Sequence, residues 1–275
     1  MAYTLVADSC CDLTRALREE WDVKNVPLTL TLAEKEFTDD DSLDLPQFML
    51  EMKACKGRVG SAAPSPSHYA DAFGSEDAFA VTLSSNLSGS YGSAMVGKGI
   101  AEEAGAHVHV FDSRSAAAAE VLIVMKIRKL ILEGLQKSEI VARVERFIKE
   151  MRTFFVLDNI DNLLKNGRLN RITATIISTL HIRPIMGADG NGNISLFSHV
   201  QGWKQVVKKL ADTIENDGRA TKGQSLVITH CNNPMLAEEL KSEIERRYDF
   251  SEILILPTRG VSSLYANEKG IIMAF

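Results

Sequence analysis

Long apolar segments and an excess of basic residues are both missing from this sequence. Its most apolar stretch, residues 116–127, is interrupted by Glu120 and Lys126. A membrane-spanning helix needs about 20 apolar residues, so we expect no stable membrane insertion. Acidic residues outnumber basic ones by 36 to 31, which gives a net charge of −5. Nucleic acids are bound largely through positive charge, so we expect no nucleic-acid partner and disfavour a DNA-binding regulator.

Cysteine is scarce, and its spacing fits neither a disulfide framework nor a zinc site. Two of the four cysteines are adjacent, at Cys10 and Cys11, and the other two are isolated, at Cys55 and Cys231. The first eight residues lack both the basic region and the apolar core of a signal peptide. These absences predict a cytoplasmic protein with reduced thiols.

Two segments begin like metal sites but lack the ligands to complete them. Asp8 and Asp12 flank the two adjacent thiols, with no histidine nearby in the sequence, so we expect Asp12 to cap the following helix instead. The turn after Asp189 resembles a calcium loop, but Ile194 and Val200 stand where that pattern needs Gly and Glu. We therefore expect no metal and no other cofactor.

Aromatic residues make up only 7% of a chain that is 45% hydrophobic, so the core must be mainly aliphatic. The length of 275 residues suggests two domains. In the first half, apolar runs typical of strands alternate with helical patterns, which predicts a parallel sheet with helices on its faces. In the second half, residues 182–186 and 193–197 flank a Gly-rich turn that predicts a hairpin. The predicted fold class is α/β, with an N-terminal α/β domain (1–152) and a C-terminal α+β domain (153–275).

Local signals place several of the predicted elements. Ser65, followed by Pro66, is expected to cap a helix, and residues 23–32 are expected to be extended. Residues 39–41, three consecutive aspartates, are expected to form a solvated loop. Further strands are predicted at 3–7, 78–83, 108–111, 154–157, 226–229, 253–256 and 271–275. Helices are predicted at 14–21, 46–52, 90–104, 116–133, 139–151, 159–164, 203–216 and 234–247.

Polar side chains follow three of the predicted strands of the first half. Asp8-Ser9, Ser84-Ser85 and Asp112-Ser113 each stand where a strand ends. Ligands of parallel sheets bind beyond the carboxyl ends of the strands, so we expect these ends to converge on one crevice. Ser9 and Asp112 are therefore candidates for its lining. His230, at the end of a later strand, is a further candidate, although a buried, hydrogen-bonded histidine is the preferred interpretation.

The segment Ser84-Ser85-Asn86-Leu87-Ser88-Gly89-Ser90-Tyr91 carries five side-chain hydroxyls between a strand and a helix. A helix N-terminus offers free N–H groups and the positive end of the dipole, which favours an anion site. The alternative is a polar turn with a capping serine. A second hydroxyl-rich turn begins at Ser61. The chain has no G-x-S-x-G motif at these serines, which disfavours a hydrolase nucleophile.

Taken in order, these motifs resemble the DegV family of bacterial fatty-acid-binding proteins. The similarity runs along the whole chain and is carried by eight segments. They are Asp8-Ser9 with Asp12-Leu13, Val26-Pro27-Leu28, Phe37-Thr38-Asp39, Pro64-Ser65-Pro66, Ser84 to Tyr91 with Ser93-Ala94, Asp112-Ser113, Leu163 with Gly167-Arg168, and Arg183-Pro184-Ile185.

The resemblance implies a two-domain carrier with one long-chain fatty acid, such as palmitate or oleate, buried between its domains. It implies that hydroxyls hold the carboxylate, with some members presenting the acid to a separate fatty-acid kinase for acyl-phosphate formation. The residues of this chain that match the carboxylate-binding motifs or lie beside them are Ser61, Ser88, Ser84, Ser85, Ser90 and Arg168.

The sequence departs from the family pattern in three places. Ser61-Ala62 stands where the family has Thr-Ser, and Ser90 replaces a threonine. The C-terminal His-Thr-Gly-Pro-Gly motif of many members is absent, and the segment Thr258 to Tyr265 occupies its place. Arg259 is a candidate for the missing charge at the pocket. The rival hypothesis is a small-molecule phosphotransferase or hydrolase using the same crevice, since the family fold is similar to the substrate-binding subunit of dihydroxyacetone kinases.

Overall fold

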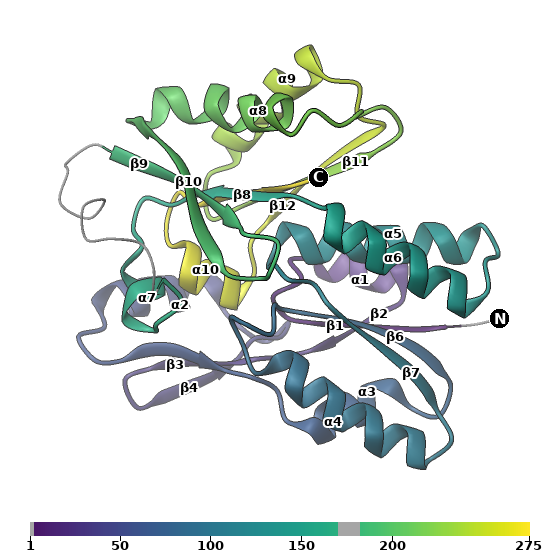
Figure 1. Ribbon diagram of the computed structural model, residues 1–275. Coiled ribbons are helices and arrows are strands. Elements are labelled where there is room, and N and C mark those ends of the chain that lie inside the picture. The colour runs from purple at the N-terminus through teal and green to yellow at the C-terminus, as the bar shows by residue number, and fades with distance from the viewer. Residues whose placement is uncertain (1–2, 170–181) are drawn as a thin grey trace.

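A computed structural model describes residues 3–169 and 182–275, which form two halves that each contain a large sheet (Figure 1). The elements of the first half are β1 (Thr4–Asp8), α1 (Arg15–Trp21), β2 (Val23–Val26), β3 (Thr29–Leu32), β4 (Lys35–Thr38), α2 (Leu45–Ala54), β5 (Val59–Ala62), α3 (Pro66–Phe73), β6 (Asp77–Thr82), α4 (Ser90–Glu103), β7 (His107–Asp112), α5 (Ala118–Leu132) and α6 (Lys137–Glu150).

The second half begins with β8, whose first residue is also the first residue of the predicted second domain. Its elements are β8 (Thr153–Val156), α7 (Asp161–Lys165), β9 (Ile182–Ala188), β10 (Ile194–Gln201), the 3-10 turn η2 (Trp203–Gln205), α8 (Val206–Asp217), β11 (Ser225–His230), α9 (Pro234–Arg247), β12 (Glu252–Pro257), α10 (Gly260–Ala266) and β13 (Ile271–Ala274).

The sheet of the first half is parallel throughout, in the order β2-β1-β6-β7, as predicted. Side chains of a strand point alternately to the two faces. On β1, Leu5 and Ala7 join the core beneath α5, whereas Val6 packs with Tyr69 and Phe73 of α3. Both faces are covered by helices, which explains why these strands are apolar runs without polar alternation.

The sheet of the second half is mixed, in the order β10-β9-β8-β13-β11-β12. β9 and β10 form the predicted antiparallel hairpin, while β11 and β12 are parallel. Along β13, Ile271 and Met273 face the core under α8 and α9, and Ile272 and Ala274 face the first half. The predicted α+β character of this half is confirmed.

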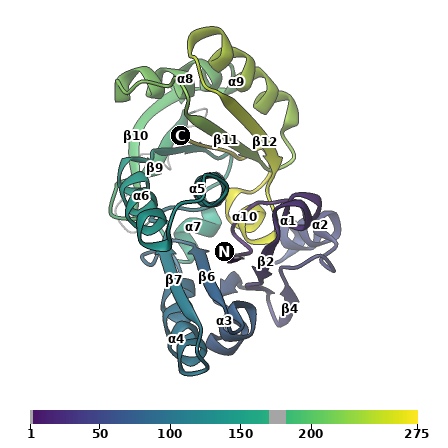
Figure 2. The same cartoon turned by 90° about the vertical axis from the view of Figure 1, so that its right-hand side faces the viewer.

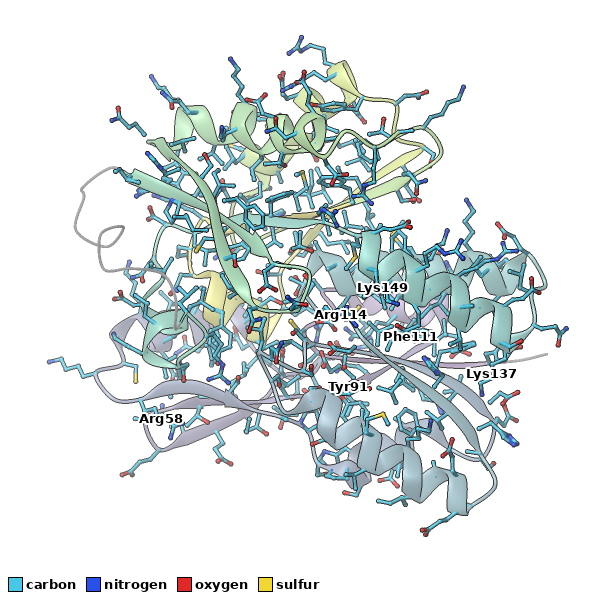
Figure 3. The ribbon with its side chains drawn as sticks, viewed as in Figure 1. Arg58, Tyr91, Phe111, Arg114, Lys137 and Lys149 are labelled. Atoms are coloured by element: carbon cyan, nitrogen blue, oxygen red, sulfur yellow. The ribbon has the colours of Figure 1, made fainter. Side chains whose placement is uncertain are left out.

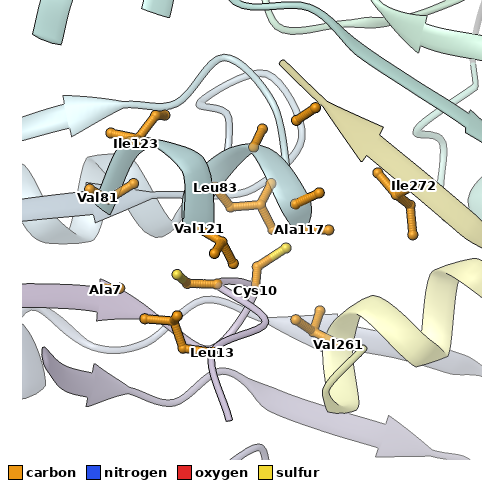
Figure 4. Packing of buried hydrophobic residues seen from close by; sticks show 14 of the residues in the cluster. Ala7, Cys10, Leu13, Val81, Leu83, Ala117, Val121, Ile123, Val261 and Ile272 are labelled. Carbon is orange, nitrogen blue, oxygen red and sulfur yellow. The ribbon is translucent and has the colours of Figure 1, made fainter. Parts of the chain in front are cut away.

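Helix α5 lies between the two large sheets (Figure 2), in contact with β6 on one side and with β11 and β13 on the other. Nine of its residues are buried. The close-up in Figure 4 shows Val261 and Ile272 of the second half beside Cys10, Ala117 and Val121 of the first. Because the halves share one apolar core, the division at residues 152 and 153 stays a prediction.

Two parts of the fold were not predicted. A small antiparallel sheet, in the order β4-β3-β5, lies beside the parallel one. All four residues of β4 are at least partly exposed, so it lacks a buried apolar face. Helix α10 is also missing from the prediction, because the side chain that binds its first N–H groups belongs to Asp39, which is far away in the sequence.

Two predictions about aspartates were wrong. Asp39 is fully buried rather than solvated, and its carboxylate accepts hydrogen bonds from the N–H groups of Gly260 (3.0 Å) and Val261 (2.8 Å) in α10. Asp12 does not cap α1, because the Thr14 hydroxyl accepts the Leu17 N–H. Asp12 instead accepts the Arg259 N–H at 2.8 Å. Both aspartates therefore bind the segment that begins α10, which sequence spacing alone does not reveal.

Candidate functional site

A cavity of about 110 Å³ lies between the two halves. Its wall is mainly aliphatic, with polar groups from both halves. The lining residues are Cys10, Ser61, Leu83, Leu87, Ser88, Arg114, Ser115, Ala116, Ala117, Thr153, Phe155, Leu157, Leu163, Arg168, Ala188, Gly192, Asn193, Ile194, Val261, Ser262, Tyr265, Ala266 and Ile272. An apolar space with a few convergent polar groups is the usual form of a small-molecule site.

Three polar side chains of the wall, Ser61, Tyr265 and Arg168, contact one another. The Ser61 hydroxyl lies 3.0 Å from the Tyr265 hydroxyl, and the Arg168 guanidinium stands over the Tyr265 ring at 5.7 Å. Arg168 Nε also donates to the Leu87 carbonyl at 3.1 Å, which places this arginine next to Ser88. β5, the loop after β6, the turn after α7, and α10 therefore bring three hydroxyls and one cation together.

Ser88 sits one residue before Gly89, the N-cap of α4. Its hydroxyl oxygen accepts the Ser90 N–H at 3.2 Å, which leaves the O–H free to donate to a ligand. The first turn of α4 has free N–H groups, and its dipole favours a negative charge. This end of the cavity is therefore suited to a carboxylate.

The other serines of this segment have partners elsewhere. Ser84 donates to the Gly192 carbonyl at 2.7 Å, which joins this loop to the tip of the β9–β10 hairpin. Ser85 donates to Asp112 at 2.6 Å. Ser90 is fully buried and bonded to Asp8 and Tyr69. None of these three serines lines the cavity. The geometry thus favours Ser88 over them as a ligand contact.

Four residues predicted for the pocket lining also lie outside the cavity wall. Ser9 accepts the Leu28 N–H, and Asp112 is bound to Ser85. His230 accepts the Asn233 N–H through Nδ1 and borders a different hollow. Arg259 pairs with Asp41 at 3.3 Å.

Buried acids lie behind the cavity wall. Glu120 is fully buried on α5, and neither of its carboxyl oxygens has a hydrogen-bond partner among the described residues. Burial, followed by the charge of Asp8, raises the pKa of Glu120 well above its usual range. Burial also raises the pKa of Asp12, to about 7. Burial therefore favours the neutral form of Glu120 in the folded chain.

Cys10 also contributes to the wall, but its thiol is not activated. Burial, together with the neighbouring carboxyl groups of Glu120 and Asp8, raises the pKa of Cys10 well above its usual range. A thiol with a raised pKa is a poor nucleophile. Among residues 3–169 and 182–275, no group of three or more His, Cys, Asp and Glu side chains is placed to hold a metal ion.

Tyr265 is the site residue that sequence reasoning missed. It lies in the segment that replaces the C-terminal histidine motif, five residues after Gly260. Asp39 and Asp12 hold the start of this segment, so that the Tyr265 ring reaches Ser61 and Arg168. The available signal was the tyrosine itself, since a phenol near hydroxyl-rich turns can donate to a carboxylate.

Comparisons with known proteins agree on one family. The model of a family described as "Uncharacterised protein, DegV family COG1307" matches residues 2–274. A DegV domain-containing protein of Streptococcus pneumoniae is 36% identical over 282 residues, covering 100% of this chain and 99% of the relative.

Solved structures show the same fold. A DegV family protein from Ruminococcus gnavus, described with vaccenic acid, has a TM-score of 0.94 at 35% identity and covers 99% of each chain. The Streptococcus pneumoniae Fatty Acid Kinase (Fak) B3 protein, loaded with linoleic acid, has a TM-score of 0.91 at 34% identity, covering 100% of this chain and 99% of that one. A DegV family protein from Eubacterium eligens, loaded with heptadecanoic acid, has a TM-score of 0.90 at 30% identity and covers 99% of each chain.

The helices give no sign of a membrane span. Within the part of the chain that the structure describes, none of them combines the length and the apolar composition that crossing a bilayer requires.

Proposed function

Since the chain belongs to the DegV family, we propose that it binds one long-chain fatty acid in the cavity between its two halves. The observation that carries this proposal is the makeup of the cavity wall. Its aliphatic surface includes Ser61, Tyr265 and Arg168 in contact with one another, and Ser88 follows Leu87, whose carbonyl accepts from Arg168. Relatives at 34% and 35% identity are described with linoleic and vaccenic acid.

Apolar burial supplies most of the affinity. Each buried methylene contributes about 0.8 kcal/mol, so an acyl chain of roughly fifteen methylenes contributes about 12 kcal/mol before the costs of association. A hydrogen bond to a charged carboxylate adds about 1.5–3 kcal/mol. The acyl chain therefore sets the affinity, and the polar group sets the orientation of the acid.

The carboxylate is held by hydroxyls, a helix end and one cation. Ser88 donates from the N-terminus of α4, and the Ser61–Tyr265 pair supplies a further donor. Arg168 provides the positive charge that neutral hydroxyls lack. In this proposal, Tyr265, which lies in the segment that replaces the C-terminal histidine motif, donates its hydroxyl to the carboxylate.

The function proposed is that of a carrier rather than an enzyme. Among the described residues, no histidine lines the cavity, and the cysteine that does, Cys10, has a raised pKa. The chain instead holds the acid for a fatty-acid kinase, in keeping with the description of the pneumococcal relative. Hydrolysis of acyl phosphates or p-nitrophenyl esters by the pure protein would favour the rival enzyme hypothesis.

The carboxylate assignment predicts that Ser88→Ala weakens binding of oleate by about 10- to 100-fold, since it removes a hydrogen bond to a charged group worth about 1.5–3 kcal/mol. Tyr265→Phe keeps the ring beneath Arg168, removes only the hydroxyl, and is expected to act in the same direction. Titration of delipidated protein with a fluorescent fatty acid measures both changes.

The matched control is Cys231→Ser, which changes a buried side chain outside the cavity wall. Its affinity should stay within about twofold of wild type. Equal losses in Ser88→Ala and Cys231→Ser would mean that the serine acts on folding rather than on the carboxylate. Unchanged binding of oleyl alcohol by Ser88→Ala would show that the lost contact belongs to the acid group.

A further inference from the structure

A second and larger hollow, of about 1460 Å³, opens between the halves on the side of α2, α7 and α10. The cavity and this hollow share Arg168 as a wall residue. Val59 borders the hollow and Ser61 lines the cavity, two residues apart on β5. Asn166 fixes this arrangement by donating to the Val59 carbonyl at 2.9 Å. The hollow therefore begins next to the polar end of the cavity.

The hollow is basic, although the chain as a whole is acidic. Three carboxylates border it, and two of them are paired with cations, Asp158 with Arg183 and Asp161 with Lys165. The six cations of its wall are Lys53, Lys56, Arg58, Lys165, Arg168 and Lys269. Within residues 3–169 and 182–275, Lys53, Lys56, Arg58 and Lys269 form no ion pair, and all four are exposed.

One rim of the hollow is built on unfavourable backbone conformations. Asn232, Asn267 and Lys269 have φ angles of 50°, 54° and 67°, values that non-glycine residues rarely adopt. Two backbone hydrogen bonds of 2.9 Å hold this rim, from Cys231 to Gly270 and from Lys269 to Cys231. Such conformations persist where the surrounding structure enforces them, and they concentrate at functional sites.

We propose that this basic hollow is the docking surface for the fatty-acid kinase, and that it binds an acidic face of that enzyme. The inference rests on the proposed function. In the kinase reaction, a carboxylate oxygen forms a bond to the γ-phosphorus of a nucleoside triphosphate, the β–γ bridging P–O bond breaks, and the nucleoside diphosphate leaves. The reacting groups are all anionic, so cations beside the carboxylate favour their approach.

The positive charge of the hollow favours an acidic partner. Unpaired surface cations steer an acidic partner and fix its orientation, and the effect falls with ionic strength. The exposed cations come from both halves, Lys53, Lys56 and Arg58 from the first and Lys269 from the second. A partner bound across them would contact both walls of the cavity next to the carboxylate.

The test compares two double charge reversals in the full-length, oleate-loaded protein. Lys56→Glu/Arg58→Glu, the hollow variant, reverses two positive charges at the border of the hollow. Lys129→Glu/Arg146→Glu makes the same change in net charge at exposed positions of α5 and α6. These helices lie away from Arg58, which Figure 3 shows near the small sheet. Acyl-phosphate formation is measured with the Streptococcus pneumoniae fatty acid kinase at several salt concentrations, and fatty-acid content is measured in the same samples.

We expect the hollow variant to keep its fatty acid and to lose at least tenfold in kcat/KM for the loaded carrier. We also expect a weaker dependence on salt than in wild type, while the control stays within twofold. Normal acyl-phosphate formation from the fatty acid on the Lys56→Glu/Arg58→Glu variant would overturn the inference. So would a loaded wild-type protein whose fatty acid the kinase does not phosphorylate.

Two further outcomes distinguish failure of this inference from failure of the proposed function, and kinase docking from membrane binding. If wild type carries no fatty acid, the proposed function fails first. If the fatty acid on the Lys56→Glu/Arg58→Glu variant is phosphorylated normally but the variant no longer binds vesicles containing phosphatidylglycerol, the surface serves an anionic membrane and the kinase assignment is wrong.

Discussion

Ala116→Phe should abolish most fatty-acid binding while leaving the chain folded. Ala116 lines the cavity in the loop before α5 and is only partly buried. A phenyl ring at this position would fill much of a cavity of about 110 Å³. If it displaces about four methylenes of the acyl chain, the loss is roughly 3 kcal/mol, or 100- to 200-fold in affinity.

The same titration with a fluorescent fatty acid measures this effect, with circular dichroism as the check on folding. Ala220→Phe makes the same substitution at an exposed position outside the cavity and should leave the affinity unchanged. Ala116→Ser should have a small effect, because it adds little volume. Wild-type affinity in Ala116→Phe would mean that the acyl chain does not occupy this cavity.

Asp39→Ala should lower the free energy of unfolding by about 2–3 kcal/mol. Asp39 is fully buried and accepts two N–H groups at the start of α10. Each buried donor left without an acceptor costs about 1–3 kcal/mol. Burial raises the pKa of Asp39, so its removal also relieves part of the cost of burying the acid. A loss near the lower end of the combined range of about 2–6 kcal/mol follows.

Fatty-acid affinity should fall in the same variant, because α10 carries Tyr265. Asp39→Asn retains one acceptor oxygen and should be intermediate in both measurements. The control Glu36→Ala removes an exposed carboxylate of β4, and it should change stability by less than 0.5 kcal/mol. Urea unfolding of the three variants measures their free energies of unfolding and checks this order of stability. Wild-type stability in Asp39→Ala would show that this contact between the halves contributes nothing.

Gly260 shows how closely this contact is packed. A Cβ atom at residue 260 would lie 2.3 Å from Asp39 Oδ1 and 2.7 Å from Leu43 Cδ2. Only a glycine allows the carboxylate to reach the two N–H groups. This contact helps to place Tyr265 at the cavity, so a backbone requirement in α10 shapes the carboxylate site.

The sequence was sufficient to predict the elements with strong periodicity. The apolar strand ends at Asp8 and Asp112, the helix that Ser65 caps, and the 182–197 hairpin all appear in the structure. Each of them depends on residues close together in the chain. Ser61, Ser88 and Arg168 line the cavity as the family resemblance implied, and their contact with a carboxylate stays a prediction.

The features that sequence reasoning missed depend on distant residues. Asp39 is separated by 221 residues from Gly260, and Ser61 by 204 from Tyr265. In a run of three aspartates, the sequence alone does not distinguish a buried carboxylate from a solvated one. Asp39 is buried because α10, which is far away in the sequence, packs against it. The serines after β6 were equally ambiguous, since only the fold shows which hydroxyls bind the protein and which face the cavity.

Mass spectrometry of the protein as purified from a bacterial host tests the central proposal most directly. A native spectrum gives the mass of the intact complex, and a denaturing spectrum with lipid extraction identifies what is released. We expect one long-chain fatty acid per chain in the native spectrum, and its loss on denaturation. A chain that is repeatedly free of lipid, and that takes up neither palmitate nor oleate when these are supplied, would contradict the proposal.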